Sequence, residues 1–199
     1  MKIGIMGGTF DPIHNGHIVL AKSAYEQFNL DKVLVMPSAN PPHKVNIVEA
    51  KAAQRSEMVK LAIEGIPYLE YSGIELERGG YIYSVDTLTM LKKQNPENEY
   101  YFIIGADSLF SLENWYRPDE LLKTTNVIAA KRGDKDNHDL RRQIDYLRHK
   151  YCASIYLLDI PKIDISSRNI RQMISDKKDI SNLVPSTVYN YIKKVKLYD

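Results

Sequence analysis

Short apolar segments that suit β-strands alternate along this chain with longer segments whose apolar residues recur every three or four positions. Strands are expected at 2–6, 32–36, 68–76, 100–104, 126–130 and 154–158. Helices are expected at 16–28, 49–64, 84–93, 140–151, 166–174 and 185–195. Such alternation predicts an α/β fold, a Rossmann-like, doubly wound and mostly parallel sheet with helices on both faces. We expect a single domain that spans residues 1–199, because 199 residues suffice for one well-buried core.

Composition narrows the class of protein. Apolar residues make up 44% and charged residues 26%, as in ordinary soluble proteins. The net charge of +2 argues against a protein that coats nucleic acid. Because Cys152 is the only cysteine, a disulfide framework within the chain and a cysteine-rich zinc site are excluded. No signal-peptide pattern and no membrane-length apolar run is present, so we expect a cytoplasmic protein without membrane partners.

A glycine-rich loop, GGTFDPIHNGH at 7–17, follows the first expected strand. Gly7 and Gly8 let the backbone turn tightly and approach a ligand closely. Backbone N–H groups there, together with the helix start that follows, can hold phosphate oxygens. His14 and His17 are three residues apart, so both rings can lie on one side of the turn and donate to phosphate. The loop is therefore a candidate phosphate site at the carboxyl end of a strand, where such sheets bind ligands.

The loop lacks both common nucleotide-binding glycine patterns, GxxxxGK[ST] and GxGxxG. Two alternatives remain open for it. One is a plain glycine turn with surface histidines. The other is a zinc site formed by His14, His17 and His43, which lacks a neighbouring cysteine or a fourth ligand.

A second candidate anion site, ISSRNIR, spans 165–171 and opens a predicted helix. Ser166 is a natural N-cap, and serine hydroxyls with unpaired N–H groups can hold an anion. Arg171 lies one turn further on and can point a bidentate fork at phosphate. The alternative is an ordinary capped helix.

These two motifs resemble GG[TS]FDPxHxGH and ISSTxIR of the bacterial nicotinate mononucleotide adenylyltransferases, which belong to the HxGH nucleotidyltransferase superfamily. The resemblance covers nearly the whole chain, and it implies that residues 166–199 complete the ATP site. It implies that ATP is bound by Gly7, Gly8, Thr9, Phe10, Gly16, Asp107, Arg132, Ile165, Ser166 and Ser167. It assigns catalysis to His14, His17, Lys44 and Arg171, with Lys44 in a PPHK segment at 41–44. Arg168 departs from the family pattern, because it stands where threonine is typical.

Two further resemblances concern the acceptor. YSVDTL at 83–88 resembles Y-[ST]-x-D-T-L, which implies that Asp86 and Thr87 bind the mononucleotide at a helix start. A helix N-terminus suits a carboxylate. Trp115 matches a tryptophan that stacks on the pyridine ring, a sensible use of an aromatic face. The alternatives are an ordinary helix start and a half-buried core tryptophan.

The implied reaction is attack by the 5′-phosphate of nicotinate mononucleotide on the α-phosphorus of ATP, which releases pyrophosphate. Catalysis would rest on positioning and charge stabilisation, with Mg²⁺ entering on the triphosphate and no metal site of the protein's own. Three alternatives stay open: another acceptor such as a pantetheine phosphate or the amide mononucleotide, a non-catalytic nucleotide sensor, and a nucleic-acid binder. The oligomeric state is also open, with a homodimer as one alternative.

Overall fold

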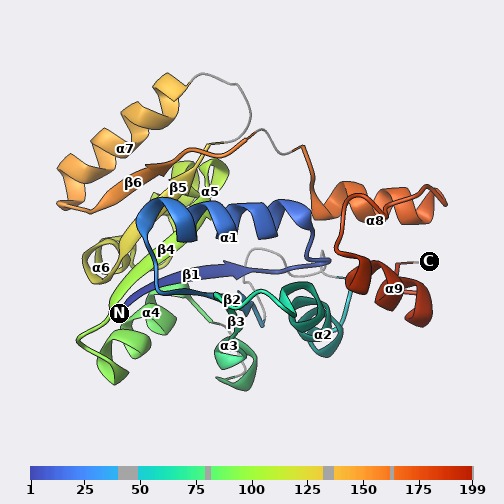
Figure 1. Ribbon diagram of the computed structural model, residues 1–199. Helices are drawn as coiled ribbons and strands as arrows, with labels where there is room; N and C mark the ends of the chain where they lie inside the picture. The colour runs from blue at the N-terminus through green and yellow to red at the C-terminus, as the bar shows by residue number, and fades with distance from the viewer. Residues whose placement is uncertain (40–48, 79–81, 132–136, 162–163, 199) are drawn as a thin grey trace.

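A computed structural model describes residues 1–39, 49–78, 82–131, 137–161 and 164–198. Within them, six strands form one sheet in the order β3-β2-β1-β4-β5-β6, and every neighbouring pair is parallel. The strands are β1 (Lys2–Gly8), β2 (Lys32–Pro37), β3 (Leu69–Tyr71), β4 (Glu99–Gly105), β5 (Asn126–Ala130) and β6 (Ile155–Leu158). The chain runs outward from β1 to β3, returns to β4 beside β1, and runs outward again to β6 (Figure 1). The predicted doubly wound, parallel sheet is confirmed.

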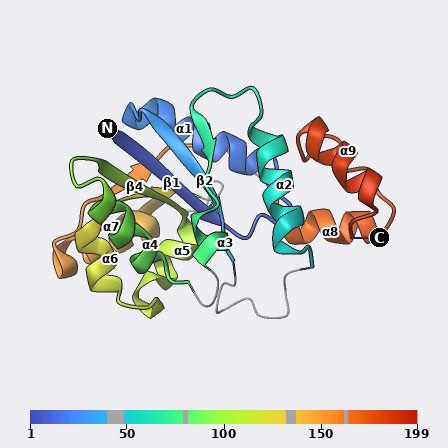
Figure 2. The same ribbon diagram turned by 90° about the horizontal axis from the view of Figure 1, so that it is seen from below.

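Helices cover both faces of this sheet (Figures 1 and 2). They are α1 (Asn15–Phe28), α2 (Ala52–Ile63), α3 (Ile74–Arg78), α4 (Ser84–Gln94), α5 (Ala106–Ser111), the 3₁₀ turn η1 (Leu112–Asn114), α6 (Pro118–Thr124), α7 (Asn137–Tyr151), α8 (Ser167–Ser175) and α9 (Ser186–Val195). Helices α8 and α9 lie beyond the carboxyl end of β1 in both views. None of the helices in the described ranges is long and apolar enough to cross a membrane.

The core divides into two layers because successive strand residues point to opposite faces. In β2, Val33 and Val35 belong to the layer covered by α1, α2, α8 and α9. Met36 belongs to the layer covered by α4, α5, α6 and α7. In β4 the same alternation places Ile103 in the first layer and Phe102 in the second. Buried positions on both faces explain why these strands are nearly continuous apolar runs rather than alternating ones.

The strand expected at 2–6 continues to Gly8, and the helix expected at 140–151 begins at Asn137. Three other predictions also differ from the structure. The strand expected at 68–76 ends at Tyr71, because Gly73 starts a helical turn in which its carbonyl accepts from Glu77 N at 3.0 Å. The helix expected at 49–64 begins at Ala52, because Lys51 has an extended backbone and acts as the N-cap. Pro185, expected at the first helical position, is instead the N-cap of α9. The short elements α3, α5, η1 and α6 carry too little periodicity to be predicted.

The pairing between β1 and β4 stops before either strand ends. It runs from Lys2–Glu99 to Ile5–Phe102, whereas β1 continues to Gly8 and β4 to Gly105. Beyond this pairing β1 follows β2, with Gly8 beside Pro37, and β4 follows β5. The two halves of the sheet therefore separate at their carboxyl ends, which is where folds of this type bind ligands.

Gly4 on β1 lies against three buried side chains, and it offers a test of the core. A Cβ at Gly4 would lie 2.9 Å from Leu30, 3.0 Å from Val33 and 3.1 Å from Ile103. We expect Gly4→Ala to lower the free energy of unfolding by about 1–3 kcal/mol, because three buried side chains would have to shift together. Gly105→Ala is the matched control, since nothing lies within 4 Å of its Cβ position. Urea unfolding of both variants measures the difference, and equal stabilities would contradict this account.

Candidate active site

A pocket of about 650 Å³ opens where β1 and β4 separate. Both sequence motifs and part of the acceptor motif face it. The predicted site residues that line it are Gly7, Gly8, Thr9, Phe10, His14, Gly16, His17, Thr87, Asp107, Trp115, Ile165, Ser166, Ser167 and Arg171. The structure thus brings together residues that lie more than 160 positions apart in the sequence. Lys44, Arg132 and His43 lie outside the described residues.

The loop after β1 has a fixed, tight shape. Phe10 adopts a left-handed backbone with φ of 50°, which is uncommon for any residue other than glycine. Its ring closes over Gly8, where an added Cβ would lie 2.8 Å from it. The Gly8 carbonyl accepts from Ser38 N at 2.8 Å, which ties the loop to the end of β2. Glycine at position 8 is therefore required by close approach, as expected for a loop that must lie against a ligand.

The two predicted histidines stack on each other at the start of α1. Their ring centroids are 3.7 Å apart and the interplanar angle is 26°. The backbone N–H of His14 donates to Nδ1 of His17 at 3.2 Å. Because Nδ1 accepts, the proton of a neutral His17 ring resides on Nε2, which makes that atom a donor. The histidine pair therefore lies at the helix N-terminus, where a phosphate group binds favourably.

His14 is the more buried of the pair, at 6% exposure. Burial lowers the pKa of His14 to about 4, because the charged imidazolium loses its hydration. His14 is therefore neutral at physiological pH without a ligand. An arriving phosphate would favour the charged ring, so the anion and the proton would bind cooperatively.

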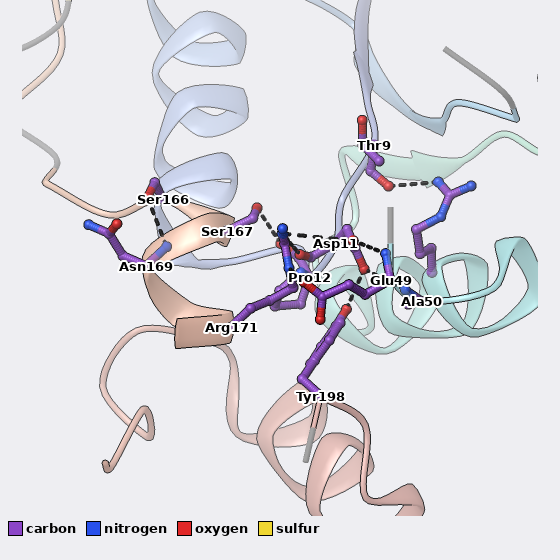
Figure 3. Close-up of polar contacts among 11 residues, drawn as sticks. Thr9, Asp11, Pro12, Glu49, Ala50, Ser166, Ser167, Asn169, Arg171 and Tyr198 are labelled. Atoms are coloured by element: carbon purple, nitrogen blue, oxygen red, sulfur yellow. Dashed lines mark hydrogen bonds and ion pairs between the residues drawn. The ribbon is translucent and has the colours of Figure 1, made fainter. Parts of the chain in front are cut away.

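The second motif forms the start of α8 as predicted. Ser166 is the N-cap, and its hydroxyl accepts from Asn169 N at 3.2 Å. Ser167 donates its hydroxyl to the carbonyl of Pro12 at 2.9 Å (Figure 3). Arg168, the departure from the family pattern, is exposed and lines the pocket. The predicted cap is confirmed, and it joins the C-terminal segment directly to the glycine loop.

Arg171 also turns toward the glycine loop. Its Nη1 donates to the Asp11 carbonyl at 2.9 Å, and its Nε donates to Glu49 Oε1 at 2.7 Å. The side chain is 12% exposed and lines the pocket. Among the described residues, Nη2 has no hydrogen-bond partner. Two hydrogen bonds thus hold the Arg171 guanidinium in place at the pocket wall, an arrangement that suits phosphate binding.

Sequence reasoning missed the buried carboxylate that organises this region. Asp11, 3% exposed, accepts from the N–H groups of Glu49 at 2.9 Å and Ala50 at 3.1 Å. It also accepts from the Tyr198 hydroxyl at 2.7 Å (Figure 3). Its position within the first motif is the one sequence feature that points to Asp11. Its bonding partners come from distant segments, so its role could not be predicted. These contacts lie directly before α2, whose N-cap is Lys51 in an extended conformation.

A buried arginine on α2 was missed as well. Arg55, 1% exposed, donates through Nη1 to the carbonyls of Thr9 at 2.7 Å and Ser38 at 2.8 Å. Its Nη2 donates to the Ala39 carbonyl at 3.2 Å. Burial lowers the pKa of Arg55, and the nearby charge of Asp11 opposes that shift. Arg55 therefore holds the loops after β1 and β2 against each other. No pattern in the sequence around Arg55 predicts that role.

At the other end of the pocket lie the predicted acceptor residues. Thr87 is buried and donates its hydroxyl to Glu75 Oε1 at 3.2 Å. Trp115 is half-buried, packs edge-to-face on Phe102 with centroids 6.1 Å apart, and lines the pocket. It therefore combines core packing with an exposed pocket surface. Asp86 does not line the pocket and lies 3.8 Å from Arg117, so its predicted role in binding stays a prediction.

Glu75 is a second buried acid that the sequence did not single out. It lines the pocket and is 9% exposed. Burial raises the pKa of Glu75 to about 7, while the hydrogen bond from Thr87 acts in the opposite direction. A substantial fraction of this side chain is consequently uncharged at neutral pH.

Comparisons with known proteins agree with this geometry. The chain matches the cytidylyltransferase-like family over residues 5–173. It is 41% identical over 197 residues to the probable nicotinate-nucleotide adenylyltransferase of Lachnoclostridium phytofermentans, covering 99% of this chain and 98% of that protein. It is 42% identical, with the same coverage of both chains, to the probable nicotinate-nucleotide adenylyltransferase of Carboxydothermus hydrogenoformans.

A solved structure supports the fold. The nicotinic acid mononucleotide adenylyltransferase of Plasmodium falciparum, complexed with NaAD, superposes with a TM-score of 0.80. The match covers 100% of this chain and 97% of that chain at 22% identity. At this identity the likeness speaks for the architecture only.

The raised pKa of Glu75 predicts a pH-dependent cost to stability. Between pH 4.5 and 7 the unfolded chain releases the Glu75 proton and the folded chain retains it, so folding stability falls as pH rises. Glu75→Gln has no charge to bury and keeps an acceptor for Thr87. We expect this variant to be about 1–3 kcal/mol more stable than the wild type at pH 8 and equal to it at pH 4.5.

The measurement is urea unfolding at pH 4.5, 6 and 8. Glu77→Gln on the same helix is the matched control, because Glu77 is exposed and should show little pH-dependent gain. An equal gain at pH 4.5 and 8 would show that Glu75 carries no such cost.

Proposed function

The chain belongs to the cytidylyltransferase-like family and groups there with nicotinate-nucleotide adenylyltransferases, and from this membership we propose that it transfers AMP from ATP to nicotinate mononucleotide. A phosphate oxygen of the mononucleotide forms a bond to the α-phosphorus of ATP. The bond from that phosphorus to the bridging oxygen breaks, and pyrophosphate leaves with the electron pair. The products are nicotinate adenine dinucleotide and pyrophosphate, which places the enzyme in NAD biosynthesis.

One observation carries the proposal. The glycine loop and the start of α8 lie side by side and line one pocket at the carboxyl ends of β1 and β4. Two helix N-termini, two histidines and Arg171 supply donors and positive potential there. This combination suits a triphosphate, and it supports assigning the ATP end of the site to these residues.

The histidines would act on the α-phosphate. Both rings lie at the start of α1, and the proton on His17 Nε2 is a donor for an oxygen that gains negative charge. Such a hydrogen bond strengthens as charge develops, and that differential stabilisation lowers the barrier. No general base is required, since a phosphate monoester with a second pKa near 6 is already a nucleophile at neutral pH.

Mg²⁺ is expected to enter with ATP as part of the substrate. No group of three His, Cys, Asp or Glu side chains within the described ranges is arranged to hold a metal ion. Mg²⁺ commonly binds through substrate phosphates and one or two carboxylates, so such a group is not needed. Asp107 lines the pocket directly after β4, and we infer that its carboxylate assists. The bound ion would neutralise charge on the leaving pyrophosphate.

Several finer assignments belong to the same proposal. We infer that the chain acts as one domain in the cytoplasm and that the segment from 166 onward completes the ATP site. The contacts of Ser167 with Pro12 and of Arg171 with Asp11 support that role. Lys44 and Arg132 are proposed to add positive charge around the phosphates. A homodimer remains part of the proposal without a described interface.

The acceptor end favours a pyridine carboxylate. Thr87 and Trp115 line the pocket near the start of α4, and a helix N-terminus attracts a carboxylate more strongly than a neutral amide. A pantetheine phosphate has no flat ring that could stack on the face of Trp115. A non-catalytic sensor would bind ATP and release no pyrophosphate with any acceptor.

Replacing His17 tests the catalytic assignment. We expect His17→Ala to lower kcat for dinucleotide formation by about 10²–10³, because one donor to the charged transition state is lost. His149→Ala, an exposed histidine on α7, serves as the control and should keep wild-type turnover. Steady-state pyrophosphate release measures both. Near-wild-type kcat in His17→Ala would refute the assignment.

An acceptor panel tests the substrate. With saturating MgATP, nicotinate mononucleotide should exceed its amide by roughly tenfold in kcat/KM, the size expected for a helix N-terminus acting on a full charge. Phosphopantetheine should give no turnover. Preference for the amide, or pyrophosphate release with phosphopantetheine alone, would exclude the proposed acceptor.

A further inference from the structure

Tyr198, the penultimate residue of the chain, contacts the first motif. Its hydroxyl donates to Asp11 Oδ1 at 2.7 Å, across 187 positions of sequence (Figure 3). The Tyr198 backbone has a φ of 70°, a left-handed conformation that residues other than glycine seldom adopt. The side chain is thus held in place rather than trailing from the end of α9.

The Asp11 carboxylate that receives this bond is nearly inaccessible to solvent. Its other partners among the described residues are the N–H groups of Glu49 and Ala50 and, at 3.8 Å, Arg171 Nη1. A buried charge depends on every hydrogen bond that replaces water. The Tyr198 hydroxyl is the only one of these partners that comes from the C-terminal end of α9.

Asp11 in turn places both groups that hold Arg171. Its backbone carbonyl accepts from Arg171 Nη1, and its carboxylate holds the backbone of Glu49, whose own carboxylate accepts from Arg171 Nε. The three residues therefore form a closed ring of contacts at the pocket wall. Moving the Asp11 carboxylate would shift two of the three contacts in this ring.

Tyr198 is a donor at every physiological pH. Burial raises the pKa of Tyr198 far above its usual value, and the charge and hydrogen bond of Asp11 raise it further. The hydroxyl consequently keeps its proton, and the bond to Asp11 does not depend on titration of Tyr198 near neutrality.

We propose that Tyr198 is a positioning residue for the phosphate end of the site: its hydroxyl fixes Asp11, which through Glu49 and its own carbonyl fixes the guanidinium of Arg171. The inference rests on the proposed function, because it takes the triphosphate of ATP as the ligand of Arg171. Nothing in the described part of the chain links Tyr198 to the acceptor end of the pocket. Its removal should consequently affect one substrate and spare the other.

The test is Tyr198→Phe, which removes one oxygen and keeps the ring. We expect the KM for MgATP to rise about 3- to 10-fold, with the KM for nicotinate mononucleotide unchanged within about 2-fold. Tyr191→Phe on α9 is the matched control, since its hydroxyl bonds to none of the described residues, and it should leave both KM values unchanged. The melting temperature is measured for each variant to separate positioning from a general loss of stability.

Coupling to Asp11 is measured in a double-mutant cycle with Asp11→Leu, which has nearly the same shape and no oxygen to accept from Tyr198. If Tyr198 acts through Asp11, the Tyr198→Phe change should raise the KM for MgATP much less in the Asp11→Leu background than in the wild type. Equal effects in both backgrounds would overturn the proposal. So would unchanged kinetics in Tyr198→Phe, or an equal rise in both KM values.

MgATP binding measured calorimetrically without acceptor separates this inference from the proposed function. A weaker affinity in Tyr198→Phe than in Tyr191→Phe would support the role of Tyr198 even if the wild type failed to turn over nicotinate mononucleotide. An unchanged dissociation constant would overturn that role whatever the acceptor proves to be.

Discussion

The end of the β1–β4 pairing at Ile5 and Phe102 is the constraint on which the rest of the site depends. Beyond this point β1 and β4 no longer pair with each other, although each still pairs with its outer neighbour. Their carboxyl ends therefore border a common space. Each half of the sheet then brings one segment to that space, the glycine loop from β1 and the start of α5 from β4. Packing on both faces of the sheet fixes the positions of the strands. The shape of the pocket therefore depends on the packing of the core.

Within that space, two buried ionic groups hold the loops. Arg55 fastens the loop after β1 to the loop after β2 through three carbonyls. Asp11 fastens the same loop to the start of α2 and to the C-terminal segment. A buried charge lowers stability unless its polar atoms form hydrogen bonds. Such groups therefore contribute little net stabilisation, and their contribution here is to hold the loops in one specific arrangement. A loop that must present N–H groups to phosphate gains from that specificity, because misplacement by about 1 Å is costly in rate.

The sequence predicted the parts of this site that have a local signature. The apolar strand runs, the Ser166 cap and the segment from Gly7 to His17 all rest on spacing within a few residues. The structure confirms the cap and places the segment at the pocket, although Gly7 and Gly8 belong to the end of β1 rather than to the loop. Asp11, Arg55 and Tyr198 were not predicted in their roles, because those roles exist only through partners from distant segments. Glu75 escaped for a related reason: its helix α3 was mistaken for the end of a strand, which hid the face that meets Thr87.

The charge state of the pocket bears on why the proposed chemistry needs no general base. Burial keeps His14 neutral, and the Arg171 guanidinium lies beside the carboxylates of Glu49 and Asp11, so the charge of Arg171 is partly compensated before ATP arrives. Interactions that are equally strong with the ground-state triphosphate and with the transition state tighten ATP binding without raising the rate of the chemical step. The proposed role of the histidines depends on charge that grows on the α-phosphate oxygens, because a more negative acceptor strengthens the hydrogen bond from His17 Nε2. In the proposed reaction this difference between ground state and transition state would lower the barrier, and the attacking phosphate monoester needs no proton removed.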